Sequence, residues 1–130
     1  MKRIVLAVVA VFIAWSAMDF VIHGMILASS YEATARLWRP MGEMKFWVMH
    51  LAGLITAMSF VCIYGLLVAE KGIGTGLKYG LLFGLGTGVA MGFGTYSFLP
   101  IPLHMAVAWF IGTLVETLVG GVIVGSIIRK

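Results

Sequence analysis

The sequence predicts an all-α, polytopic membrane protein that forms a single domain over residues 1–130. Its composition is the first observation: 62% of the residues are hydrophobic and only 11% are charged, a mixture from which a water-facing surface cannot be built. The second is the presence of four apolar stretches, each long enough to span a hydrocarbon core of about 30 Å at about 1.5 Å of rise per helical residue. We therefore expect four transmembrane helices and a short interfacial helix.

The predicted first span has a basic start and an apolar run, as a secretory signal does. The run continues past Asp19 to Ala28, so we predict a spanning helix instead of a cleaved leader. Short polar or proline-containing breaks then separate the later spans, and Pro100 and Pro102 predict a sharp reversal before the last one. The predicted spans cover residues 4–28, 46–68, 74–98 and 102–128.

The segment between the first two spans is the only sizeable one expected outside the bilayer. Ser29 and Glu32 have the spacing of a capping box, which predicts the start of a helix over residues 30–39. Pro40 predicts its end. Leu37 and Trp38 supply apolar bulk, which is typical of a helix that lies at headgroup level.

Basic residues predict the orientation, because cytoplasmic loops carry an excess of Lys and Arg. One side would carry Lys2, Arg3, Lys71, Lys78, Arg129 and Lys130. The other would carry only Arg36, Arg39 and Lys45. We therefore predict a multi-pass protein of the cell (inner) membrane with both termini in the cytoplasm.

Glycines recur every four residues through the third predicted span. Because glycine lets two helix backbones approach closely, such a row predicts a helix-packing face. The partner could be the fourth span of the same chain or a second subunit, and the sequence leaves both open. The predicted packing residues are Gly76, Gly80, Gly84, Gly88 and Gly92, with Gly121 and Gly125 in the fourth span.

Ionisable residues inside apolar spans are costly, so each is a functional hypothesis. His23, His50 and His104 fall at similar depths near the outer boundary, and Asp19 shares a helix face with His23. If these faces meet, three imidazoles and a carboxylate suit a divalent transition metal, and two of the imidazoles could hold a haem. Alternatively, the histidines hydrogen-bond to headgroups or backbone, with Asp19 orienting His23.

Glu116 is expected near the bilayer midplane with no basic residue at comparable depth. Burial there favours the neutral acid, which could act with Asp19 in a proton or ion path. A single interhelical hydrogen bond is the simpler interpretation. His104 and Glu116 should point about 120° apart on one helix, which argues against a tight site that contains both.

Several classes of protein are excluded by what the sequence lacks. The basic residues punctuate apolar runs without forming a patch, so nucleic acid is not an expected partner. The single cysteine, Cys62, allows no intramolecular disulfide. No nucleotide loop, nucleophile elbow or HExxH motif is present, so we predict no enzymatic activity.

The polar end of the first span at 19–24, the Leu37-Trp38-Arg39-Pro40 loop and the glycine-rich third span with its tight turn resemble small four-span bacterial membrane proteins of unknown function. The resemblance covers the whole chain and implies no activity.

Three functions remain open. The first is an accessory or scaffolding subunit that packs through the glycine row with itself or other membrane subunits. The second is a metal- or haem-binding protein that uses the outer histidines. The third is a small oligomeric proton- or cation-linked carrier that uses Asp19 and Glu116. The sequence favours the first, because it requires only helix packing.

Overall fold

A computed structural model describes residues 1–129, which are almost entirely helical and contain no strand. Five α-helices alternate with short π-helical or 3-10 segments. The α-helices are α1 (Lys2–Val21), α2 (Ala28–Ala33), α3 (Phe46–Cys62), α4 (Ile73–Val89) and α5 (Leu103–Ile127). The π-helical segments are η1 (Ile22–Ile26), η4 (Ile63–Leu67) and η5 (Ala90–Gly94), and the 3-10 segments are η2 (Ala35–Leu37) and η3 (Met41–Glu43).

All four predicted spans are helical, within a few residues of the predicted bounds. Three continuous helical stretches are long and apolar enough to cross a membrane: Lys2–Ile26, Phe46–Leu67 and Leu103–Ile127. The stretch formed by α4 and η5 is not among them. Its many glycines lower its mean hydropathy, because glycine is far less hydrophobic than the leucine and phenylalanine residues between them.

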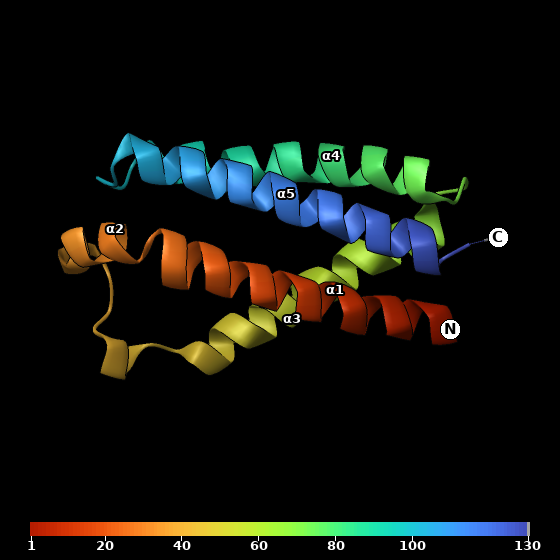
Figure 1. Ribbon diagram of the computed structural model, residues 1–130, viewed down its shortest axis with the longest axis horizontal. Coiled ribbons are helices and arrows are strands. Elements are labelled where there is room, and N and C mark those ends of the chain that lie inside the picture. Colours follow the sequence, from red (N-terminus) through yellow and green to blue (C-terminus); the bar gives the residue numbers. More distant parts are fainter. Residues whose placement is uncertain (130) are drawn as a thin grey trace.

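The four long helices run alternately up and down, so the loops lie at two opposite ends (Figure 1). At one end, the guanidinium of Arg3 donates a hydrogen bond to the carbonyl oxygen of Arg129 at 3.1 Å. At the other end, the Ser30 hydroxyl lies 2.9 Å from Nε2 of His104. The chain therefore begins and ends its helices at the same end of the bundle.

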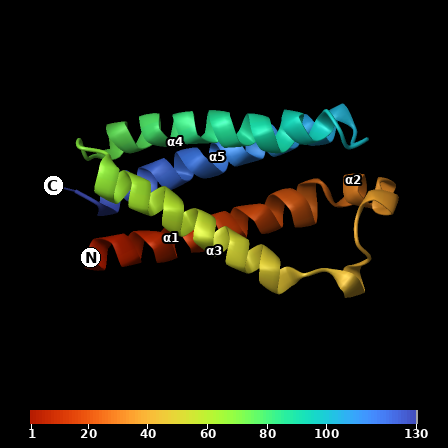
Figure 2. The same cartoon turned by 180° about the vertical axis from the view of Figure 1, so that it is seen from behind.

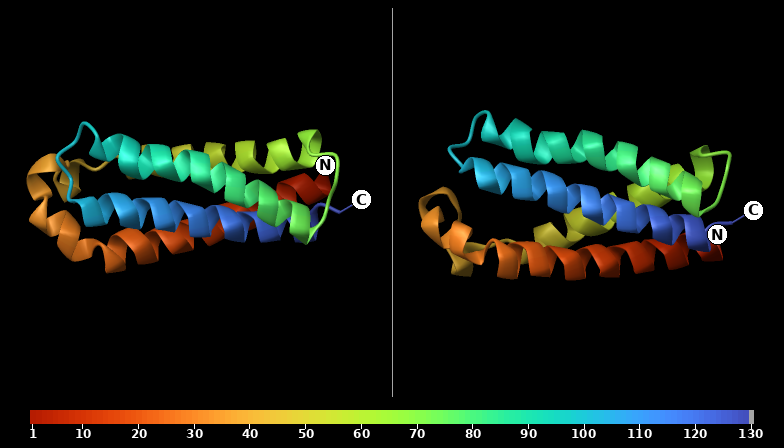
Figure 3. Two further views of the ribbon diagram at one scale, coloured as in Figure 1. Left: turned by 90° about the horizontal axis from the view of Figure 1, so that it is seen from above. Right: turned by 45° about the horizontal axis from the view of Figure 1, so that its top comes forward.

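Helices α4 and α5 run closely alongside each other in every view (Figures 1 and 3). The glycine row of α4 is buried in this contact. A Cβ placed on Gly80 would lie only 2.2 Å from the carbonyl oxygen of Thr117, and one on Gly76 only 2.0 Å from that of Gly121. The row thus has its partner within the chain, in the fourth predicted span, and a seam between subunits would have to use other surfaces.

Helix α3 is arranged differently, because it crosses α1 and its Phe46 end diverges from α4 and α5 (Figure 2). Buried side chains form two separate clusters as a result. One joins the first half of α1 to the second half of α3 and the end of α5, with Val11, Phe60 and Tyr64 fully buried. The other surrounds Met105 and Trp109 at the first-loop end of α5.

The first loop departs from its prediction. The helix begins at Ala28, with Leu27 as its N-cap and no side-chain capping bond, so the predicted capping box of Ser29 and Glu32 is wrong. Ser29 lies inside the first turn and not at the N-cap position, which explains the difference. The helix expected over 30–39 is also broken: α2 ends at Ala33, and a 3-10 turn follows.

The same loop packs back onto the bundle. Tyr31, Leu37 and Trp38 contact the second apolar cluster, next to the start of α5. The Trp38 indole donates to the Thr34 hydroxyl at 2.8 Å, and that hydroxyl donates to the carbonyl oxygen of Ser30 at 2.8 Å. The loop therefore forms a folded cap over the first-loop end of α5.

Candidate functional site

A cavity of about 360 Å³, with polar and ionisable groups set in a largely apolar wall, lies between the two apolar clusters, where α1, α3, α4 and α5 do not close on one another. Two acids and a histidine contribute to its wall, together with threonines from three helices and three aromatic residues that have a polar tip. The ionisable residues are Asp19, His23 and Glu116, the threonines Thr56, Thr87, Thr113 and Thr117, and the aromatics Trp15, Tyr31 and Trp109.

Asp19 and His23 face each other along one side of the first helical stretch. Nε2 of His23 lies 3.7 Å from Oδ1 of Asp19, and their side chains are 43% and 54% exposed. The shared helix face predicted from the four-residue spacing is confirmed. His23 lies in the π-helical segment η1, a rare local geometry that recurs at functional sites. Both side chains are thus accessible from the cavity.

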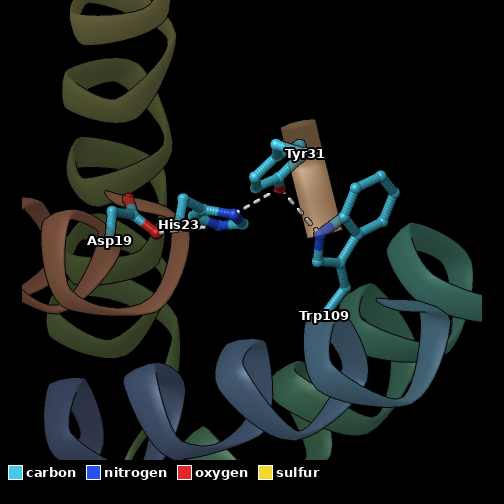
Figure 4. Close-up of polar contacts among 4 residues, drawn as sticks. All are labelled: Asp19, His23, Tyr31 and Trp109. Carbon is cyan, nitrogen blue, oxygen red and sulfur yellow. Dashed lines mark hydrogen bonds and ion pairs between the residues drawn. The ribbon is translucent and has the colours of Figure 1, made fainter. Parts of the chain in front are cut away.

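A hydrogen-bonded chain extends this pair to α5 (Figure 4). Nδ1 of His23 lies 2.6 Å from the Tyr31 hydroxyl, and Nε1 of Trp109 donates to that hydroxyl at 2.9 Å. Burial raises the pKa of Tyr31 above its ordinary value, the Trp109 bond lowers it, and the charge of Asp19 raises it. The phenol therefore keeps its hydrogen at physiological pH.

One tautomer of the neutral histidine lets every member of this chain act as a donor. The indole of Trp109 is a donor only, so Tyr31 accepts from Trp109 and its own hydrogen is left for Nδ1 of His23. The imidazole hydrogen then lies on Nε2, on the side of Asp19. Tyr31 and Trp109 thus orient His23 toward the carboxylate.

Glu116 brings the second carboxyl group to the same cavity from α5. Both Glu116 and Asp19 line this cavity. Its Oε1 is buried and has no hydrogen-bond partner in residues 1–129. The Trp15 indole donates to the backbone carbonyl oxygen of Glu116 at 2.6 Å, which ties α1 to α5 at this level. The two acids that the sequence suggests for a proton or ion path therefore line one cavity, and the path itself stays a prediction.

The remaining predicted ligands lie elsewhere. Neither His50 nor His104 lines the cavity. Nδ1 of His50 bonds to the carbonyl oxygen of Phe46 on its own helix at 2.7 Å, and His104 bonds to Ser30. No group of three or more His, Cys, Asp or Glu side chains in residues 1–129 is placed to hold a metal ion. The set of His23, His50, His104 and Asp19 is thus not assembled.

Three aromatic residues of the site were missed by the sequence reasoning. Trp15, Tyr31 and Trp109 each combine an apolar ring with a hydrogen-bonding tip, which lets them line a cavity with polar groups inside an apolar bundle. A weak signal was present, because Trp15 lies four residues before Asp19 and shares its helix face. Tyr31 and Trp109 are 78 positions apart, and no local pattern relates them.

The charge of the cavity indicates the kind of solute that it can hold. Its wall, which consists entirely of described residues, includes two carboxyl groups and no lysine or arginine. Two neighbouring carboxyl groups resist simultaneous ionisation unless a positive charge lies between them. Aromatic faces also attract cations. A proton or a cationic solute therefore complements this site, whereas an anion does not.

Neither a scan against protein-family models nor searches of curated proteins and of solved structures found a match to this chain. Its class is therefore defined by its own fold and site. Over residues 1–129 it is all-helical with three helices long and apolar enough to cross a membrane, and a cavity that bears two carboxyl groups lies between those helices and α4.

Proposed function

We propose that the protein is a four-span membrane protein, with the α4–η5 stretch as the fourth spanning element beside α5. Membrane spanning by all four is supported by their alternating directions and by the glycine-mediated contact that covers one face of α4. The basic residues at the end that holds both termini favour a cytoplasmic location for that end, in the inner membrane. The first-loop cap would then lie at the outer interface.

Within this topology, we propose that the protein is a proton-linked carrier of small cationic solutes. The observation that carries this function is the convergence of Asp19, His23 and Glu116 on one cavity inside the bundle. Intramembrane acids are what a proton-coupled carrier uses, because one carboxyl pair can bind either a proton or a cation. Competition between the two would link cation uptake to proton release.

The accessory-subunit role lacks comparable support. It was expected to use the glycine row, but Gly76, Gly80 and Gly84 are buried against α5 of the same chain. Assembly with itself or with other membrane subunits would need another surface.

Proteoliposomes test the carrier function. Vesicles with an acidic lumen and a trapped pH-sensitive dye receive external sodium or tetramethylammonium, a quaternary cation that cannot carry a proton across lipid by itself. Exchange should raise the luminal pH as the cation enters and protons leave. Glu116→Gln and Asp19→Asn should abolish this rise. Glu43→Gln, in the first loop and outside the cavity lining, is the matched control and should retain it.

Either of two results would overturn the proposal. One is the absence of any cation-dependent pH change with the wild-type protein for both cations. The other is a pH change that persists in both cavity variants, because the carboxyl groups would then be irrelevant to transport.

A further inference from the structure

A second hollow, of about 490 Å³, adjoins the cavity. It is a groove between the α1–η1 stretch and α5, lined only by apolar side chains and glycine, whereas the wall of the cavity also carries carboxyl and other polar groups. Val21 and Val115 on its rim are each 44% exposed, so the groove opens on the outer surface of the bundle, which faces lipid in the proposed topology.

The groove and the cavity share two wall residues, Ile22 and Gly112. These two touch: a Cβ on Gly112 would lie 3.1 Å from Cδ1 of Ile22. The side chain of Ile22 therefore forms the partition between the two spaces, lying on a glycine that leaves room for it. Because χ1 of a β-branched residue in a helix is restricted, rotation about χ2 of Ile22 is the side-chain change that would join the groove to the cavity.

We propose that the solute bound by this protein is an amphipathic amine, with its cationic head in the cavity and its apolar tail in the groove between α1 and α5. This inference rests on the proposed cation-binding function and adds the chemical class of the solute. It follows from two adjoining spaces, one whose wall bears two carboxyl groups and the other entirely apolar.

The arrangement favours such a molecule over an ordinary membrane lipid. A phospholipid brings a phosphate, and the cavity offers two carboxyl groups and no basic side chain to receive it. A small inorganic cation would fill the cavity alone and would leave the groove without a role. An ammonium head on an alkyl tail satisfies both spaces, and Trp15 and Trp109 add faces that attract ammonium groups.

The head is tested first, by direct binding of radiolabelled tetramethylammonium to the protein in phosphatidylcholine nanodiscs. Asp19→Asn with Glu116→Gln should weaken binding by about tenfold or more, because each charge removed takes away part of the attraction. Absence of wild-type binding, or binding unaffected by both changes, would contradict the proposed function itself.

The tail is tested by photo-crosslinking with a dodecyltrimethylammonium that carries a diazirine at the end of its chain. Mass spectrometry should place the label on groove residues such as Met18, Val21, Ile111 and Val115. Excess tetramethylammonium should remove that label, since it displaces the head. Labelling spread evenly over the lipid-facing surface, and insensitive to tetramethylammonium, would overturn the proposal while leaving cation binding intact.

Two matched variants distinguish the role of Ile22 at the junction of the two spaces from a general effect of a bulky side chain on the first helical stretch. Ile22→Phe should fill the junction, so that groove labelling falls at least about fivefold. Ile13→Phe makes the same exchange at an exposed position of α1 that lines neither space, and it should preserve both readouts. Unchanged groove labelling in Ile22→Phe would show that Ile22 does not connect the two spaces.

Discussion

Two halves of the same bundle pack in opposite ways. Between α4 and α5, backbone meets backbone, and a Cβ at Gly92 would lie 2.4 Å from the carbonyl oxygen of Ala106. Between α1, α3 and α5, large aromatic and ionisable side chains hold the helices apart around a cavity. In lipid, small residues allow close van der Waals contact, whereas polar side chains remain where they can meet one another. The closed half can thus support the half that contains the cavity.

The largest effect is expected from a substitution that disrupts the close packing of α4 on α5. Gly80→Leu places a side chain where only a backbone fits, so we expect it to lower the free energy of unfolding by about 3 kcal/mol or more, or to prevent folding. Gly86→Leu is the matched control on the same helix, because a Cβ there meets nothing within 4 Å. Thermal unfolding in mild detergent compares them. Equal stability of the two variants would contradict the intramolecular packing of the glycine row.

The second largest effect is expected in the half that contains the cavity, where one substitution should raise stability and abolish cation binding. Glu116→Leu removes a buried oxygen that has no partner in the described residues, so we expect stability to rise by about 1 kcal/mol while cation binding is lost. Glu43→Leu in the first loop serves as the control. A loss of stability in Glu116→Leu would show that the carboxyl group contributes to packing, contrary to a purely functional role.

The third effect concerns the hydrogen-bonded chain to His23. Tyr31→Phe and Trp109→Phe should each cost about 1 kcal/mol, and together less than their sum, because they remove the same hydrogen bond. Tyr31→Phe should also change the pH dependence of cation binding, since His23 then loses its hydrogen-bond partner at Nδ1. Tyr96→Phe, away from the cavity, is the control. Additive costs would show that the two side chains act independently.

The smallest effect comes from the histidines outside the cavity. His50→Ala and His104→Ala remove exposed side chains, so each should change stability by less than about 0.5 kcal/mol and leave cation binding intact. His23→Ala, by contrast, should weaken cation binding. Elemental analysis of the three variants and the wild type adds a second readout. Stoichiometric metal in the wild type that is lost in all three variants would favour the four-residue metal site expected from the sequence.

The sequence by itself determined the helical class and the bounds of the long helices, because apolar runs of this length can satisfy their backbone in lipid only as helices. It also determined the pairing of Asp19 with His23, since four residues bring two side chains to one helix face.

Only the tertiary structure decided which partner the glycine row takes and which ionisable groups meet. Those outcomes depend on how each helix is rotated and crossed against its neighbours, and the row of small residues is the same for a neighbour in the chain and for one in another subunit. The similar depths of His23, His50 and His104 gave no information on rotation. The cavity joins His23 instead to Glu116 and Tyr31, which come from other parts of the chain.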